Sequence, residues 1–305
     1  MKKDLFALLF LAVIGLFAFS SCSDDDEVIV ETNTIVDIAL GDAQFSTLVA
    51  ALDKAGLVSV LQGSGPFTVF APTNDAFNNL LSELGASSLD DISAEALTPI
   101  LLYHVLGGAV ASSQLSTGYV STVSPGPNNS FISLYINLDN GVALNGTTNV
   151  TSADIVADNG IIHVIDEVLT PPTVVDIAIA NGSFSSLVSA VVKAELVDAL
   201  SADGPFTVFA PTNDAFAQLL TDLGAGSLDD IPVSTLTDVL LYHVVSGNVR
   251  STDLVAGMVP TLNSQAEIEV DLGSDVTLNS NTKVVAVDVQ ATNGVVHVID
   301  KVLLP

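Results

Sequence analysis

The sequence contains no tryptophan, only one cysteine, Cys22, and very few basic residues. A single cysteine cannot form an intramolecular disulfide. Lysine and arginine number 7 against 35 aspartate and glutamate, which gives a formal net charge of −28. A chain of this charge repels the phosphate backbone of nucleic acids, so the composition argues against nucleic-acid binding. The acidic side chains are explained most simply as a solvated surface.

The motifs of common catalytic and metal-binding families are also missing from the sequence. It has no Gly-x-Ser-x-Gly elbow, no Gly-x-x-x-x-Gly-Lys phosphate loop, no His-Glu-x-x-His pair and no complete EF-hand loop. His163 and Asp166 are expected on opposite faces of one strand, as are His297 and Asp300, so neither pair predicts a metal site. The sequence therefore predicts no catalytic residue, no metal ion and no cofactor.

The N-terminal segment has the pattern of a secretory signal. Lys2 and Lys3 precede an apolar stretch over residues 5–19, and small residues follow it. The run Phe-Ser-Ser-Cys that ends at Cys22 resembles a bacterial lipobox, with phenylalanine where leucine is usual. The resemblance implies a signal peptide over residues 1–21, cleavage before Cys22, and attachment of acyl chains that anchor the protein to a membrane. An ordinary signal or an uncleaved anchor is the alternative.

An acidic tether is expected over residues 22–33. Its run Ser-Asp-Asp-Asp-Glu begins at Ser23. This run is similar to the acidic segment that directs some lipoproteins of diderm bacteria to the outer cell surface. The alternative is a solvated spacer that carries no targeting signal. We therefore expect an outer-membrane lipoprotein that is exposed at the cell surface, and we leave the periplasmic orientation open.

The chain carries a long internal repeat. The thirteen residues GPFTVFAPTNDAF occur at 65–77 and return unchanged at 204–216, 139 residues later. The segment NGIIHVIDEVL from Asn159 returns as NGVVHVIDKVL from Asn293, 134 residues later, so the second copy lacks five residues between these blocks. A period of this length is the size of a domain. The sequence therefore predicts one small domain used twice.

The repeat also sets the expected domain boundaries. We predict a first domain over residues 34–170 and a second over residues 173–305, joined by Pro171 and Pro172. Two prolines favour an extended, stiff linker. The five missing residues map to the loop over residues 124–130, which is rich in proline, glycine and asparagine. Loops absorb such deletions.

Within each copy, helical patterns come before strand patterns. In the first copy, apolar spacing and capping residues predict helices over 45–61, from Ala76 to Leu84 with Leu84 on the buried face, and over 93–104. Runs of β-branched and aromatic residues predict strands over 67–70, 131–138, 142–144, 155–157 and 161–169. Helices followed by strands indicate an α+β domain.

Three segments of each copy resemble the signatures of the fasciclin domain family. FTVFAPTNDAF resembles the first signature, LLYHV the Tyr-His segment, and NGIIHVIDEVL or NGVVHVIDKVL the second signature. The resemblance covers almost the whole chain beyond the tether. It implies two α+β domains, each a β-sandwich wedge of about seven strands flanked by α-helices. It also implies secreted or surface-anchored modules of cell adhesion and matrix contact, without a general catalytic activity.

The resemblance further implies candidate contact residues. In animal matrix members, integrin contact has been attributed to the Tyr-His segment and to an Asp-Ile pair just before the second signature. The matching positions are Tyr103, His104, Asp154, Ile155, Tyr242, His243, Asp288 and, as a near match, Val289. The structural alternative makes the tyrosines and histidines core residues and each aspartate an exposed neighbour of a core aliphatic. Integrin is not the expected partner of a bacterial lipoprotein. The resemblance would therefore indicate the position of a contact surface and not the identity of its ligand.

These observations predict a non-catalytic, membrane-anchored adhesion or interaction protein. Its expected partners are an extracellular or matrix protein or a cell-surface glycan, with the membrane reached through the lipid anchor on Cys22. The alternative is a structural scaffold of the cell envelope that faces the periplasm.

Overall fold

The computed structural model describes residues 33–305, which form one compact unit. The predicted signal peptide over residues 1–21, Cys22 and nearly all of the tether lie outside the described residues. No single helix within residues 33–305 is long and apolar enough to cross a membrane; two pairs of consecutive helices reach that length only across bends of 106°.

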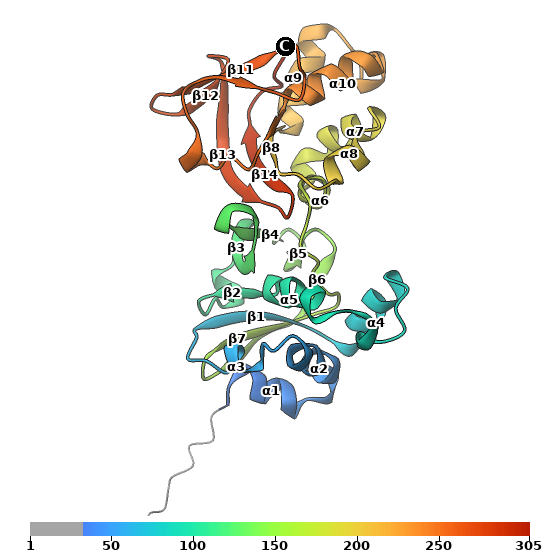
Figure 1. Cartoon of the computed structure of the whole chain (residues 1–305), viewed down its shortest axis with the longest axis vertical. Helices are drawn as coiled ribbons and strands as arrows, with labels where there is room; N and C mark the ends of the chain where they lie inside the picture. The colour runs from blue at the N-terminus through green and yellow to red at the C-terminus, as the bar shows by residue number, and fades with distance from the viewer. Residues whose placement is uncertain (1–32) are drawn as a thin grey trace, which may run out of the picture. The chain divides into compact units, whose positions relative to one another are not determined.

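The first repeat combines helices with a seven-stranded sheet (Figure 1). Its helices are α1 (Ile35–Gly41), α2 (Ser46–Lys54), α3 (Val58–Leu61), α4 (Asn74–Glu83) and α5 (Ala94–Tyr103). Its strands are β1 (Phe67–Pro72), β2 (Val105–Gly107), β3 (Gly118–Pro125), β4 (Phe131–Asn137), β5 (Ala143–Leu144), β6 (Thr148–Ala157) and β7 (Gly160–Ile165).

The second repeat reproduces this arrangement, and Figure 1 shows its helices gathered on one side of its strands. Its helices are α6 (Val174–Ala180), α7 (Ser185–Lys193), α8 (Val197–Ser201), α9 (Asn213–Leu223) and α10 (Val233–Tyr242). Its strands are β8 (Phe206–Pro211), β9 (Val244–Ser246), β10 (Gly257–Pro260), β11 (Glu267–Leu272), β12 (Val276–Leu278), β13 (Thr282–Gln290) and β14 (Gly294–Ile299).

The strand order is the same in both repeats. It runs β2-β1-β7-β6-β5-β4-β3 in the first and, in the mirrored listing, β10-β11-β12-β13-β14-β8-β9 in the second. The central pairs β1–β7 and β14–β8 are parallel, and the other neighbours are antiparallel. The pairing of β6 with β7 is interrupted by register shifts, which bend a strand and increase its twist.

Each repeat has two hydrophobic clusters, one on each side of its central strands. In the first repeat, one cluster joins the helices to the sheet and includes Phe45, Phe77 and Leu97. The other includes Phe70 of β1 and Leu134 of β4, two strands that are distant in the order of the sheet. The folded sheet and its flanking helices confirm the predicted α+β class with seven strands in each repeat.

The local elements confirm most of the predictions made from the sequence. Thr73 caps α4, because its hydroxyl accepts a hydrogen bond from the backbone N–H of Ala76 at 3.3 Å. The continuous helix expected over residues 45–61 is wrong: α2 ends at Lys54, and Gly56 adopts a φ of +68° before α3 begins. Leu84, predicted to be buried, is 56% exposed, because it is the C-terminal cap residue of α4.

The two repeats contact each other through direct hydrogen bonds. The 124–130 loop, to which the five-residue difference between the repeats maps, carries Asn128, whose side-chain amide donates to the backbone oxygen of Asn248 at 3.2 Å. The backbone N–H of Gln290 donates to the hydroxyl of Ser133 at 3.0 Å. The 124–130 loop is therefore part of the surface of the first repeat that meets the second.

Candidate functional site

The Tyr-His segment lies inside each repeat. Tyr103 is 0% and His104 is 2% exposed, and Tyr242 and His243 are 3% and 2% exposed. The hydroxyl of Tyr103 donates to the backbone oxygen of Ser133 at 2.9 Å and accepts from the side-chain amide of Asn145 at 3.0 Å. A partner would contact these four side chains only if the core opened, so the geometry gives them a structural role.

The two histidines of this segment are held as neutral rings. Nε2 of His104 accepts the backbone N–H of Leu169 at 2.9 Å, so the proton of the neutral ring is on Nδ1, which donates to the backbone oxygen of Ile100 at 2.7 Å. Burial lowers the pKa of His104, and likewise of His243, to about 4. Each ring therefore ties the end of a helix to the segment that follows the last strand of its repeat.

The Asp-Ile position lies at a bulge in β6. The register between β6 and β7 shifts between Ser152 and Ile155, and Asp154 adopts a φ of +63° within this shift. An aspartate tolerates this left-handed conformation better than most residues. The bulge turns the Asp154 side chain outward to the surface, whereas Ile155 packs against the helix-facing cluster.

The carboxylate of Asp154 is held by a neighbouring loop. The backbone N–H of Ser112 donates to Oδ1 at 2.7 Å, and the hydroxyl of Ser112 donates to Oδ2 at 2.5 Å. These hydrogen bonds lower the pKa of Asp154 below its ordinary value. The carboxylate therefore stays ionised at neutral pH while it remains open to solvent.

The second repeat repeats this geometry at Asp288. Its φ is +62°, and Ser251 donates to its two carboxylate oxygens from the backbone N–H, at 2.7 Å, and from the hydroxyl. Val289 is 3% exposed and belongs to the core of the second repeat, so the substitution of valine for isoleucine changes the core rather than the surface. The two repeats thus present matching carboxylates on matching bulges.

A buried histidine supports each bulge from behind. The backbone N–H of Asp154 donates to Nδ1 of His163 at 3.2 Å. The ring proton of His163 is therefore on Nε2, which donates to the backbone oxygen of Val110 at 3.0 Å. His297 joins Asp288 and Val249 in the same way. The spacing of these histidines in the sequence showed that they make poor metal ligands but did not predict their support of the bulges. No group of three potential metal-ligating side chains occurs within residues 33–305.

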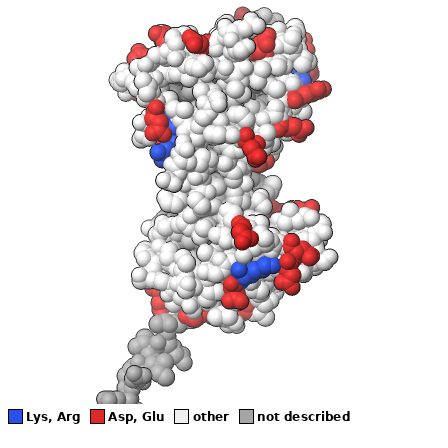
Figure 2. Space-filling view, viewed as in Figure 1, with Lys and Arg blue, Asp and Glu red and all other residues white. Residues whose placement is uncertain are grey.

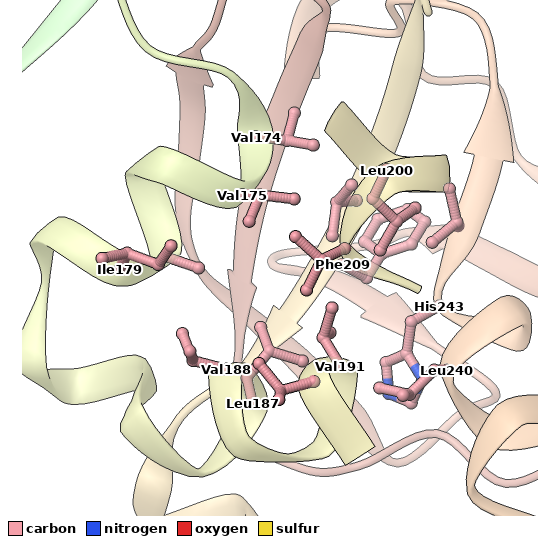
Figure 3. A pocket seen from close by; sticks show the side chains of 15 residues that line it. Val174, Val175, Ile179, Leu187, Val188, Val191, Leu200, Phe209, Leu240 and His243 are labelled. Atoms are coloured by element: carbon pink, nitrogen blue, oxygen red, sulfur yellow. The ribbon is translucent and has the colours of Figure 1, made fainter. Parts of the chain in front are cut away.

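A small apolar cavity lies under the helices of the second repeat (Figure 3). Its volume is about 50 Å³, and its wall includes Val174, Val191, Phe209 and His243. The equivalent space in the first repeat is about 20 Å³. A cavity of this size and lining is a packing difference between the repeats. Its polar side chain, His243, already uses both ring nitrogens in hydrogen bonds to the backbone.

The surface around these sites is strongly acidic. On the face seen in Figure 2, red acidic side chains are spread over both repeats and blue basic side chains are few. The described residues form ion pairs at only a few places, such as Lys54 with Asp90 and Lys193 with Asp229. The surface therefore favours basic or neutral partners over acidic ones.

Comparison with known proteins identifies both repeats. The model of the fasciclin domain matches residues 43–171 and 182–305. The chain belongs to the fasciclin domain family. These two matches lie inside the predicted domains over residues 34–170 and 173–305, apart from one residue at the linker.

The similar proteins come from distant organisms. Human periostin is 32% identical over 258 residues, which cover 83% of this chain and 30% of periostin. Rabbit transforming growth factor-beta-induced protein ig-h3 is 32% identical over 80% of this chain and 35% of its own length. Protein sll1483 of Synechocystis is 45% identical over 44% of this chain and 73% of its own length. The chain thus spans about a third of the two animal proteins.

Among solved structures, the chain is similar to the FAS1 domain pair of the insect cell adhesion molecule fasciclin I. It is 22% identical, with a TM-score of 0.49, and the match covers 88% of this chain and 96% of that one.

Proposed function

We propose that this protein is a non-catalytic adhesion or interaction protein of the cell surface, which binds an extracellular protein or glycan through its two fasciclin domains. The observation that carries the proposal is the presence of two complete fasciclin repeats, each with the same outward carboxylate on the same supported bulge. Fasciclin I, which contains such a domain pair, is a cell adhesion molecule.

Asp154 and Asp288 are the contact residues that we propose. Each side chain is fixed by two hydrogen bonds from one serine, so a partner would meet a carboxylate whose position is already set. A fixed group loses less conformational entropy on binding than a free one. Two such sites on one chain would add avidity where a partner can reach both.

We also propose that Cys22 carries the lipid anchor and that the protein is displayed on the outer membrane. The support is the pattern of residues 2–27 alone, namely a basic start, an apolar stretch, a lipobox-like ending and an acidic run. Radiolabelled palmitate incorporated into the wild type and absent from Cys22→Ser would support the anchor. Protease cleavage of the protein on intact cells would support the outward orientation, and protection would favour the periplasmic scaffold.

Adhesion is tested by binding of the purified chain to immobilised collagen, fibronectin, peptidoglycan and a panel of glycans, with and without calcium. Saturable binding that the Asp154→Asn and Asp288→Asn double variant weakens would support the proposed contact residues. Asn retains both the left-handed backbone and a hydrogen-bond acceptor, so this change removes charge with little effect on the fold. Asp53→Ala is the control, because Asp53 is exposed and lies on a helix away from the bulges. Binding to none of these surfaces by a folded protein would overturn the adhesion proposal.

A further inference from the structure

A second candidate site is a cleft between the repeats, which we call the inter-repeat cleft. Its volume is about 440 Å³, and its wall includes Glu83, Tyr119, Tyr135 and Glu167 of the first repeat, Pro172 of the linker and Asp176 of the second repeat. The size falls within the range of small-ligand sites, which occur preferentially where domains meet. The linker is fixed at this place, because the backbone N–H of Thr292 donates to the backbone oxygen of Pro172 at 2.9 Å.

Tyr135 offers the cleft an unused hydroxyl group. The residue is only 7% exposed, and its hydroxyl forms no hydrogen bond with residues 33–305. Within those residues, every buried side-chain polar atom that is sealed from solvent has a hydrogen-bond partner. The hydroxyl of Tyr135 therefore reaches open space, and the cleft that its side chain lines provides that space.

A second tyrosine stands beside it. The rings of Tyr119 and Tyr135 are 5.0 Å apart between centroids, and the hydroxyl of Tyr119 accepts a hydrogen bond from the side-chain amide of Asn181 in the second repeat at 3.2 Å. The aromatic wall is thus anchored to both repeats. The face of an aromatic ring attracts a cation, and a guanidinium group stacks on it as well.

The remaining charged groups of the wall are all acidic. Glu83, Glu167 and Asp176 are exposed, none of them forms an ion pair within residues 33–305, and neither lysine nor arginine lines the cleft. Thr148 donates to one oxygen of Glu167 at 3.3 Å, and the capping bonds from Thr173 to Asp176 use one oxygen of that carboxylate. Each of these two carboxylates keeps a second oxygen for a ligand.

This wall selects the charge of its ligand. An anion would be repelled, and a divalent metal ion finds no group of three ligating side chains within the described residues. A neutral sugar would find hydrogen-bond acceptors but would gain nothing from the charge. An organic cation gains from the three carboxylates and from the two rings.

We propose that the inter-repeat cleft binds a basic side chain, arginine or lysine, of a partner protein. This inference rests on the proposed function, since it names the chemistry by which an adhesion partner would be recognised. The second repeat cannot form an equivalent aromatic wall. In β10 and β11 the pair that corresponds to Tyr119 and Tyr135 is Met258 and Glu269, which face each other in the same register.

Tyrosine fluorescence of the full chain provides the test, because the chain has no tryptophan and only four tyrosines. The probes are a tripeptide, acetyl-Gly-Arg-Gly-amide, and its citrulline counterpart, which has almost the same shape without the charge. We expect a saturable change with the arginine peptide, weakened by added salt, and a much smaller change with the citrulline peptide. Equal binding of the two peptides would overturn the proposal.

Variants then locate the binding. Glu167→Gln and Glu83→Gln should each weaken binding about two- to fivefold, as expected for the loss of one exposed charge pair. Tyr135→Phe removes the free hydroxyl and should also weaken binding. Glu269→Gln is the matched control, because it removes one charge at the position of Tyr135 in the other repeat, outside the cleft. Binding that none of the cleft variants changes, or stronger binding of a neutral oligosaccharide such as maltotetraose, would contradict the proposal.

The outcome is separable from that of the adhesion experiment. Adhesion to a surface without binding of the arginine peptide would overturn the cleft alone. Binding of the peptide without adhesion to any surface would retain the cleft as a ligand site and overturn the role in adhesion.

Discussion

The backbone N–H of Leu169 donates to Nε2 of His104 at 2.9 Å. In the second repeat, the backbone N–H of Leu303 donates to Nε2 of His243 at the same distance. These bonds close each repeat, because they join the end of a helix to the chain that follows the last strand. Each requires an unprotonated Nε2. Protonation of either ring therefore breaks the closing bond and places a charge in the core.

The first prediction is a loss of stability in mild acid. The pKa of His104 and of His243 is lowered from 6.5 to about 4 in the folded protein, whereas the unfolded chain has the ordinary value. The unfolded state therefore binds more protons between these limits, and the free energy of unfolding falls as the pH drops from 6.5 to 4. We expect a loss of about 2 kcal/mol for each histidine between pH 7.5 and pH 5.

Urea unfolding at pH 7.5, 6, 5 and 4.5 measures this loss. Carboxylates whose pKa is lowered, such as Asp37 and Asp154, lose their contribution to the free energy of unfolding only as the pH falls below about 4. They therefore do not contribute to a loss of stability between pH 7.5 and pH 5. His104→Gln serves as the control: it should be less stable at pH 7.5 and should lose less stability on acidification. A wild-type stability that is constant down to pH 5 would show that the two rings are not the titrating groups.

The second prediction concerns the hydroxyl of the buried tyrosine. Tyr103→Phe leaves the backbone oxygen of Ser133 and the amide of Asn145 each without one hydrogen bond. We expect a loss of about 1–3 kcal/mol, as for a buried group left unsatisfied. Tyr242→Phe should behave alike, because its hydroxyl joins the backbone oxygen of Glu267 and the amide of Asn279. Surface binding of either folded variant that falls below the wild type would contradict the structural role.

The third prediction separates backbone from charge at Asp288. The left-handed φ of +62° suits Asn and Gly but costs about 1–2 kcal/mol for Ala. Asp288→Ala should therefore be less stable than Asp288→Gly, although neither keeps the bonds to Ser251, and Asp288→Asn should be the most stable of the three. Thermal unfolding of the three variants gives the order. If alanine equals glycine, the bulge has relaxed and the conformation is not required.

The sequence was sufficient for elements whose signal is local. Thr73 and Ser93 cap α4 and α5 because their side chains act on amides three residues away, which a sequence shows directly. The interruption at Gly56 was missed, since the apolar spacing continues across a glycine that the structure uses to turn the chain. The short strand β2 was also missed, because its pairing partner β1 is distant in the sequence. The strand β3 was missed as well, although it pairs with the next strand, β4.

The sequence likewise predicted only part of each candidate site. Asp154 and Asp288 were found through the family resemblance, but their bulge and the serines that hold them appear only when separate segments meet. The inter-repeat cleft had a weak signal in the sequence. Tyr119 and Tyr135 have no tyrosine counterparts in the second repeat, and a difference between two otherwise similar copies marks a position that one copy uses alone.

The fourth prediction follows from the unequal cavities of the two repeats. Two positions in the wall carry a smaller side chain in the second repeat: Val174 stands where the first repeat has Ile35, and Val191 where it has Leu52. These exchanges remove one methylene each, which accounts for a cavity of about 50 Å³ against about 20 Å³ (Figure 3). Val174→Ile and Val191→Leu should therefore fill the space and stabilise the protein by about 0.8 kcal/mol each.

The reverse changes in the first repeat provide the matched control. Ile35→Val and Leu52→Val should enlarge its cavity, and Ile35→Val should cost about 0.5–1.5 kcal/mol. Urea unfolding measures all four variants under one condition. Stabilisation by the two larger side chains together with destabilisation by the two smaller ones would show that the cavity itself sets the difference. Destabilisation by Val174→Ile and Val191→Leu would mean instead that the surrounding helices α6 and α7 have no room to accept a methylene, and that the space is divided among gaps too small to fill.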